Sequence, residues 1–352
     1  MKTGRNFALL GFALTLPLAV ISLEGCGAGP GGTPPPSNIH TLPLNASATL
    51  TSSEAAQPEN IFVYSFPIPA GNQLFLGLKG DISQTSQAAV FNESLITVAT
   101  NIAGPCPVSG KVYPNYTVIF NTYPNLLPVQ NFIQKSPVAG TTQLPIDYTM
   151  PVGVPVSNCM VVILDWEGSS PVTMTSNLTM LYTAASDSTA GTLLSTNQEF
   201  VFGDNEGAGS TDDDSLSFAL VNPIPQNGTI LGFVGDISDS SYFVAPPPGK
   251  WQTTNDLYLV PGGCPASIPV NPQGWTNDGG HYYADIPKNA QHLFSRPLSG
   301  DRAQAVQQFV NQPANVKVQK GDCLVTLFGL NSPGGGGIDS ENQVQTIFLP
   351  AP

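Results

Sequence analysis

Residues 66–83, FPIPAGNQLFLGLKGDIS, return in altered form at residues 222–238, NPIPQNGTILGFVGDIS. The Pro-Ile-Pro, Leu-Gly and Gly-Asp-Ile-Ser elements recur in the same order with one residue gapped. The similarity continues downstream, where GPCPVS around Cys106 matches GGCPAS around Cys264, and NCMVVIL at Cys159 matches DCLVTLF at Cys323. Self-similarity of this kind predicts two related domains, each with its own pair of cysteines.

The repeat and the changes in composition divide the chain into five segments. We expect a signal peptide at 1–25, then Cys26 with a flexible tether to residue 38. The first domain is expected at 39–185 and the second at 215–352. An acidic linker, 186–214, joins them, and its residues 200–202 are a candidate first strand of the second domain.

Short runs of β-branched and aromatic residues, separated by glycine and proline, fill both domains. This pattern favours an all-β fold of two tandem, internally duplicated β-sandwiches, with a jelly-roll-like arrangement as one form, over a barrel or an α/β fold. The strands predicted in the first domain are 61–66, 73–78, 118–120, 160–166 and 178–182. Those predicted in the second are 200–202, 216–221, 230–234, 257–260, 324–328 and 344–349.

One short helix is also predicted in each domain. Asp301 is a candidate cap for a helix over 302–310, which would place Ala305, Val306 and Phe309 on one side. Residues 129–134, VQNFIQ, match 306–311, VQQFVN, and therefore predict the counterpart in the first domain.

Four cysteines remain after Cys26, and four cysteines allow three pairings. The duplication selects Cys106 with Cys159 and Cys264 with Cys323, so that each bond closes its own domain. Loops of this length would each contribute about 4 kcal/mol in the chain-entropy model. Zinc binding by these cysteines is disfavoured because no Cys-x-x-Cys spacing occurs.

The N-terminus has the layout of an export signal, with Lys2 and Arg5 ahead of an apolar run at 7–23. Leu23-Glu24-Gly25-Cys26 resembles the lipobox of bacterial lipoproteins. The resemblance implies acylation of Cys26, a membrane anchor that does not span the bilayer, and, because Gly27 is not an aspartate, the outer membrane of a diderm cell. A plain secretory signal and an uncleaved anchor are the alternatives.

The chain has few charges and an acidic balance. Charged residues make up 10% of it, and the formal net charge is -13. Such a surface repels phosphate backbones, so nucleic acid is excluded as a partner. The sequence makes no prediction about the oligomeric state.

The best candidate for a binding site lies in the second domain. Aligned on Phe132 and Phe309, that domain holds 19 more residues after its first cysteine, within residues 275–301. The first domain has its own extra segment at 137–155. Aromatic and polar side chains on a loop are the usual means of binding sugars or peptides. The expected contact residues are Trp275, His281, Tyr282 and Tyr283; alternatively, the aromatics fold back onto the sandwich.

Inorganic and catalytic sites have weaker signals. Calcium is the one cofactor considered, with Asp204, Glu206, Asp212, Asp213 and Asp214 as oxygen ligands, although a solvated acidic linker explains them as well. His281 with His292 is a remote zinc candidate. Asp165 and Glu167 are the candidate carboxylate pair of a glycosidase. The repeated Gly80-Asp81 and Gly235-Asp236 are interpreted as turns.

These observations favour a non-enzymatic, membrane-anchored envelope lipoprotein that binds a glycan, a peptide or an envelope protein. A structural or assembly lipoprotein without a small-molecule ligand is the alternative, and an enzyme acting on polysaccharide is a third.

Overall fold

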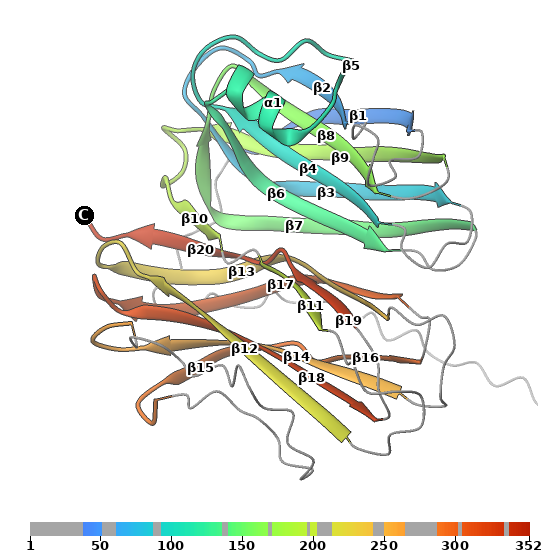
Figure 1. Ribbon diagram of the computed structural model, residues 1–352. Coiled ribbons are helices and arrows are strands. Elements are labelled where there is room, and N and C mark those ends of the chain that lie inside the picture. Colours follow the sequence, from blue (N-terminus) through green and yellow to red (C-terminus); the bar gives the residue numbers. More distant parts are fainter. Residues whose placement is uncertain are drawn as a thin grey trace, which may run out of the picture. The chain divides into compact units, whose positions relative to one another are not determined.

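The computed structural model describes residues 38–50, 61–86, 93–135, 140–167, 171–195, 198–202, 213–241, 250–264, 287–301, 305–333 and 338–352. In this part of the chain, strands form four sheets, and the fold is all-β as predicted (Figure 1). No helix among the described residues has the length and apolarity to span a membrane.

The first half of the chain folds into two facing sheets. The order across sheet A is β1 (His40–Leu50), β9 (Val172–Ala184), β3 (Gln73–Ser86) and β7 (Gly140–Val156). The order across sheet C is β5 (Lys111–Tyr113), β2 (Ile61–Pro67), β8 (Cys159–Glu167), β4 (Glu93–Asn101) and β6 (Leu126–Lys135).

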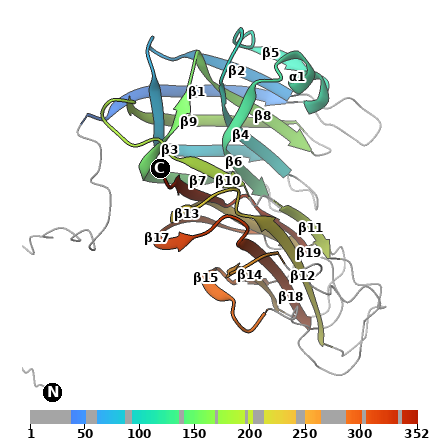
Figure 2. The same cartoon turned by 90° about the vertical axis from the view of Figure 1, so that its left-hand side faces the viewer.

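The second half repeats this arrangement with some strands divided in two (Figure 2). In sheet E, β13 (Gly228–Ser241) pairs on one side with β17 (Ala305–Val318) and on the other with β20 (Gln345–Pro350) and β19 (Ile338–Asn342). The outer strands β10 (Thr192–Ser195) and β11 (Gln198–Phe202) pair with β20 and β19. In sheet F the order is β12 (Asp213–Pro223), β18 (Cys323–Pro333), β14 (Lys250–Val260) and then β15 (Gln291–Ser295), with β16 (Leu298–Asp301) also paired to β14.

The two halves share one topology. The main strands of each half are numbered 1 to 8 along the chain, leaving out the short β5 and counting each divided strand once. In both halves one sheet then has the order 1-8-3-6, and the facing sheet has the order 2-7-4-5. Eight strands in two sheets with this order form a jelly roll. Both halves are therefore jelly rolls, and they are called the first and second jelly roll below.

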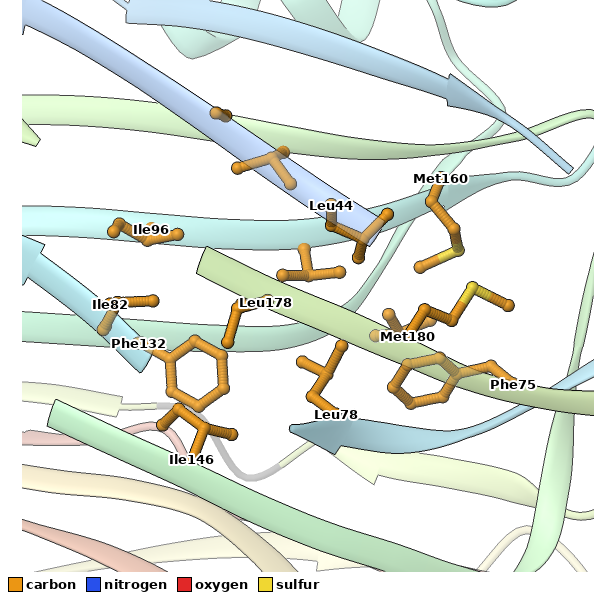
Figure 3. Packing of buried hydrophobic residues seen from close by; sticks show 14 of the residues in the cluster. Leu44, Phe75, Leu78, Ile82, Ile96, Phe132, Ile146, Met160, Leu178 and Met180 are labelled. Atoms are coloured by element: carbon orange, nitrogen blue, oxygen red, sulfur yellow. The ribbon is translucent and has the colours of Figure 1, made fainter. Parts of the chain in front are cut away.

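The core of the first jelly roll lies between sheets A and C. Leu44, Phe75 and Met180 come from sheet A, and Ile96 and Phe132 come from sheet C (Figure 3). Along β1, every second residue from 44 to 50 is buried while the residues between them are exposed. This period of two is the strand signal, because successive side chains point to opposite faces of a sheet.

The predicted helices at 129–134 and 302–310 are wrong. Residues 126–135 form β6, and residues 305–318 form β17, which alternates between exposed and more buried positions up to Val318. On β6, Phe132 faces the sandwich core while Ile133 is covered by the second jelly roll. Both faces of β6 are therefore buried, and adjacent buried residues imitate a helical pattern.

The one helix among the described residues is α1 (Tyr116–Thr122), where a strand was predicted at 118–120. Asn115 caps it, since its side-chain oxygen accepts a hydrogen bond from the backbone N–H of Val118 at 2.9 Å. Ile119 anchors the helix in an apolar cluster on the outer face of sheet C. The cap and this burial outweigh the strand preference of the β-branched residues.

Residues 137–155 are not an extra segment of the first jelly roll. They contain most of β7, which pairs with β3 as β17 pairs with β13. The alignment on Phe132 and Phe309 is wrong because β6 and β17 occupy different sheets. Between the flanking strands, the connection after the fourth main strand covers residues 102–125 in the first jelly roll and 261–290 in the second. The second is thus six residues longer, not nineteen.

The repeated Gly-Asp pairs lie inside strands, so their interpretation as turns is wrong. Gly80 and Gly235 have φ values of +127° and +149° in the middle of β3 and β13. A Cβ atom on Gly80 would collide with the carbonyl oxygen of Asn177, and one on Gly235 with that of Gln343. Glycine is required here by its conformation and by the close approach of the neighbouring backbone.

The predicted disulfides are confirmed. Cys106 bonds to Cys159 and Cys264 bonds to Cys323, across 53 and 59 residues of sequence. In each jelly roll the bond ties the start of the connection after the fourth main strand to the start of the seventh main strand. Both disulfides therefore hold a loop against the same face of the fold.

The two jelly rolls contact each other through β6 and β7 of the first and the outer face of sheet E of the second. The Ile133 N–H donates to Asp236 Oδ2 at 3.3 Å, and Gln307 Nε2 donates to the same oxygen at 2.7 Å and to the Ile133 carbonyl. Val234 and Ile347 complete the contact by joining the core cluster of the first jelly roll. Two side chains thus occupy the free edge of β6, where another strand would otherwise pair.

Candidate functional site

The predicted contact residues Trp275, His281, Tyr282 and Tyr283 lie outside the described residues, within 265–286. Both ends of that segment are described. It leaves after Cys264, which follows β14, and returns at Pro287, ahead of β15. Because β14 and β15 are antiparallel neighbours, the segment joins adjacent strands at one end of sheet F.

The outer face of sheet F next to this segment has a small apolar cluster at its base. Val260, Val325 and Leu327 are buried there together with Cys323. Tyr258, Cys264 and Ala290 pack against the cluster and are partly buried. The residues on either side of the segment, Cys264 before it and Ala290 after it, therefore lie close to Tyr258.

Three side chains above this base form the candidate site. The His292 Nε2 atom lies 3.2 Å from Asp256 Oδ1, and the rings of His292 and Tyr258 stack with their centroids 4.8 Å apart and their planes at 28°. The His292 side chain is 48% exposed, whereas that of Asp256 is 12% exposed. The sheltered carboxylate thus orients an imidazole whose ring, stacked on Tyr258, faces solvent.

The strand geometry explains why these residues meet. Asp256 and Tyr258 are two residues apart on β14 and share a face. Tyr258 is the register partner of His292 on β15. Sequence reasoning placed His292 in the candidate segment but missed Asp256 and Tyr258. Their alternation with the apolar Leu257 and Leu259 on the way to Cys264 is the signal that would have found them.

In the first jelly roll, the equivalent face is closed. Residues 102–125 cover it with β5 and α1, and Cys106, Tyr116 and Tyr123 pack against its apolar cluster. The Tyr113 hydroxyl donates to that of Tyr123 at 3.2 Å. Burial, followed by this hydrogen bond, raises the pKa of Tyr113 well above its usual range. The aromatic side chains here serve packing.

The predicted metal sites find no support in the described part of the chain. Asp204, Glu206 and Asp212 lie outside it, and Asp213 and Asp214 begin β12 with side chains that the structure does not describe. Of the zinc pair, His281 also lies outside, and His292 contacts Asp256. No group of three or more His, Cys, Asp or Glu residues suited to a metal occurs among the described residues.

The predicted carboxylate pair lies at the end of β8. Asp165 is almost fully buried and shares the outer face of sheet C with Val161 and Ile163. Trp166 points the other way, into the core. Only the backbone of Glu167 is described, so the pair as a catalytic site stays a prediction.

Comparison with known proteins identifies no family. No family model matches the chain, and no curated protein matches it. Among solved structures, those of broad bean stain virus (TM-score 0.32, 9% identity, covering 96% of both chains) and cowpea mosaic virus (0.35, 9%, 96% of this chain and 95% of that one) are similar. A tandem CBM22 domain of Paenibacillus barcinonensis Xyn10C has a TM-score of 0.19 at 10% identity, covering 91% of this chain and 95% of that one. These values are too low to bear on function.

Proposed function

We propose that the protein is an exported, membrane-anchored lipoprotein that binds a glycan without converting it, at the outer face of sheet F. The observation that carries the proposal is the exposed His292 ring, stacked on the partly buried Tyr258 with Asp256 beside it, at the base of the segment that contains Trp275, His281, Tyr282 and Tyr283.

The chemistry of a sugar fits this arrangement. The faces of aromatic rings pack on the C–H surfaces of a pyranose, and a carboxylate or an imidazole nitrogen exchanges hydrogen bonds with its hydroxyl groups. Asp256 keeps one ring in place, so less conformational entropy is lost when a ligand binds. The loop residues 275–283 would supply further rings and polar groups around it.

Export and anchoring rest on other observations. The N-terminal signal and the lipobox-like sequence ending at Cys26 support acylation. The two disulfides support an oxidising compartment outside the cytoplasm. An anchor at Cys26 and the tether after it would hold both jelly rolls near the membrane surface.

A thermal-shift screen tests the binding proposal. The protein is heated with a panel of neutral and acidic glycans and peptidoglycan fragments, each with Ca²⁺ and with EDTA. A ligand at 100 times its Kd stabilises the fold by about 2.7 kcal/mol, which moves the Tm by a few degrees. A shift with one glycan class supports the proposal, and its loss in EDTA would implicate the acidic linker. No shift with any glycan would contradict it.

The second candidate is an assembly role, and one surface favours it. A row of four exposed threonines crosses the outer face of sheet A, one on each strand: Thr49, Thr173, Thr85 and Thr141. Thr49 and Thr173 hydrogen-bond to each other at 2.9 Å. On this alternative, a partner protein co-purifies with the detergent-solubilised chain and is lost when Thr173 is replaced by Lys.

A further inference from the structure

A pocket of about 330 Å³ lies where the two jelly rolls meet. The first jelly roll contributes residues 149–151 of β7. The second contributes Leu231 and Gly232 of β13, residues 311–313 of β17, and Ile347 of β20. The strands β7 and β20 lie next to each other in both views (Figures 1 and 2).

The repeated Leu-Gly pair, Leu76-Gly77 in β3 and Leu231-Gly232 in β13, lies where strand register shifts near the pocket. The register of β3 shifts between Phe75 and Gly77, and that of β13 shifts between Ile230 and Gly232. Gly77 pairs with Thr149 across the sheet, and Gly232 pairs with Pro313 and Ile347. Irregular register bends a strand and breaks its ladder. Equivalent register shifts of the two copies thus lie next to one pocket, Gly232 in its lining and Gly77 beside the lining residue Thr149.

The lining determines which molecules fit. Met150 and Ile347 are almost fully buried and belong to the shared core, while Leu231 packs against it. The polar side chains are those of Thr149 and Asn311, since the amide of Gln312 donates to the Leu293 carbonyl at 3.4 Å, and none of the lining side chains is ionisable. A charged ligand would lose hydration here without gaining a counter-ion. A volume in this range is typical of small-molecule sites, which favour domain junctions.

We propose that this junction pocket binds an uncharged, largely apolar small molecule with a ring or a short aliphatic chain. The aliphatic side chains and the prolines would hold the apolar body, and the amide of Asn311 would bind one neutral polar group. This site is separate from the proposed glycan site on sheet F, so either one can fail without the other.

A pair of fluorescent probes tests the proposal on residues 33–352, which form one compact unit. N-phenyl-1-naphthylamine is neutral, and 8-anilino-1-naphthalenesulfonate carries the same rings with an added negative charge. We expect saturable binding of one neutral probe per chain, and about tenfold weaker binding of the anion. Non-saturable binding of the neutral probe, or equal affinity for the anion, would overturn the proposal.

Matched variants locate the probe. Asn311 and Asn315 are both exposed on β17, but only Asn311 lines the pocket. Asn311→Trp should fill the pocket and weaken binding about tenfold, whereas Asn315→Trp should change it by less than about twofold. Thr149→Trp, from the opposite wall, repeats the test if Asn311→Trp unfolds. Unchanged binding in both filling variants, or equal loss in Asn315→Trp, would contradict the site.

Discussion

Asp81 of the first jelly roll and Asp236 of the second occupy the same place in the repeated Gly-Asp-Ile-Ser, yet their surroundings differ. Asp81 is partly exposed and accepts one hydrogen bond, from the amide of Asn177 at 3.2 Å. Asp236 is fully buried and binds the Ile133 N–H and the Gln307 amide at the junction. The repeated residues thus keep the strand geometry, while the role of each side chain depends on what covers it.

The outer faces of sheets C and F differ in the same way. In the first jelly roll, Tyr116 and Tyr123 close the outer face of sheet C. In the second, Tyr258 and His292 stack at the surface of sheet F. One copy uses its aromatic residues for packing, and the other has a histidine side chain that is 48% exposed and stacked on Tyr258.

The largest effects should be equal in the two copies, because they concern the shared framework. Replacing Cys106 and Cys159 together by Ser should cost about 4 kcal/mol, and the same change at Cys264 and Cys323 should cost about as much, since the closed loops have similar lengths. Urea unfolding of both double variants measures this. A much smaller loss in one copy would show that its loop is held by other contacts.

Alanine at the mid-strand glycines should also act equally on both copies. Gly80→Ala and Gly235→Ala should each cost about 3 kcal/mol, since strain at positive φ adds to a collision with the neighbouring backbone. Gly140→Ala is the control, because Gly140 has a φ of +144° but no atom near its Cβ position. If all three variants unfold at the same urea concentration, the collision contributes nothing.

Replacement of the repeated aspartates, Asp236 and Asp81, should destabilise the two copies to different extents. Asp236→Ala leaves the Ile133 N–H and the Gln307 amide without this acceptor and should cost about 2 kcal/mol. Asp81→Ala removes one partly exposed hydrogen bond and should cost below about 0.5 kcal/mol. The urea midpoints of the two variants give the difference. Equal losses would mean that the junction does not depend on the Asp236 carboxylate.

The smallest effect concerns the hydrogen bond between Asn38, just before β1, and Asp187. Hydrogen bonds from Asn38 and then Ser186 lower the pKa of the partly exposed Asp187. A lowered folded-state pKa stabilises the fold above the unfolded value of about 3.9, and this contribution is lost as the pH falls through the folded pKa. Asn38→Ala should therefore lower the Tm slightly at pH 7 and leave it unchanged near pH 2. An equal effect at both values would assign the loss to something other than this carboxylate.

Much of the framework could be predicted from local sequence. The repeated motifs gave the duplication and both disulfides, and β-branched runs such as 160–166 gave the central strands. β1 was missed, although Leu44, Ala46, Ala48 and Leu50 alternate with polar residues. The helix predicted at 129–134 was wrong for a physical reason, because Ile133 is buried where β6 contacts the second jelly roll, and this burial hides the strand period.

The candidate site was predictable only in part. His292 was placed in the candidate segment and considered with His281 as a zinc ligand, but it was not among the predicted contact residues. Its partners were missed, because Asp256 and Tyr258 lie 36 and 34 residues earlier, and only the pairing of β14 with β15 brings them together. The junction pocket could not be predicted at all, since its walls come from strands of both jelly rolls.

Calorimetric titration with the glycan that gives the largest thermal shift tests the proposed binding site on sheet F most directly. Tyr258→Ala and His292→Ala should weaken binding about tenfold, because each removes one ring of the stack. His40→Ala is the matched control, since His40 lies against Tyr182 on the first jelly roll with ring centroids 5.4 Å apart, and its affinity should stay within about twofold of the wild type. The same affinity in all three variants would contradict a binding site on sheet F.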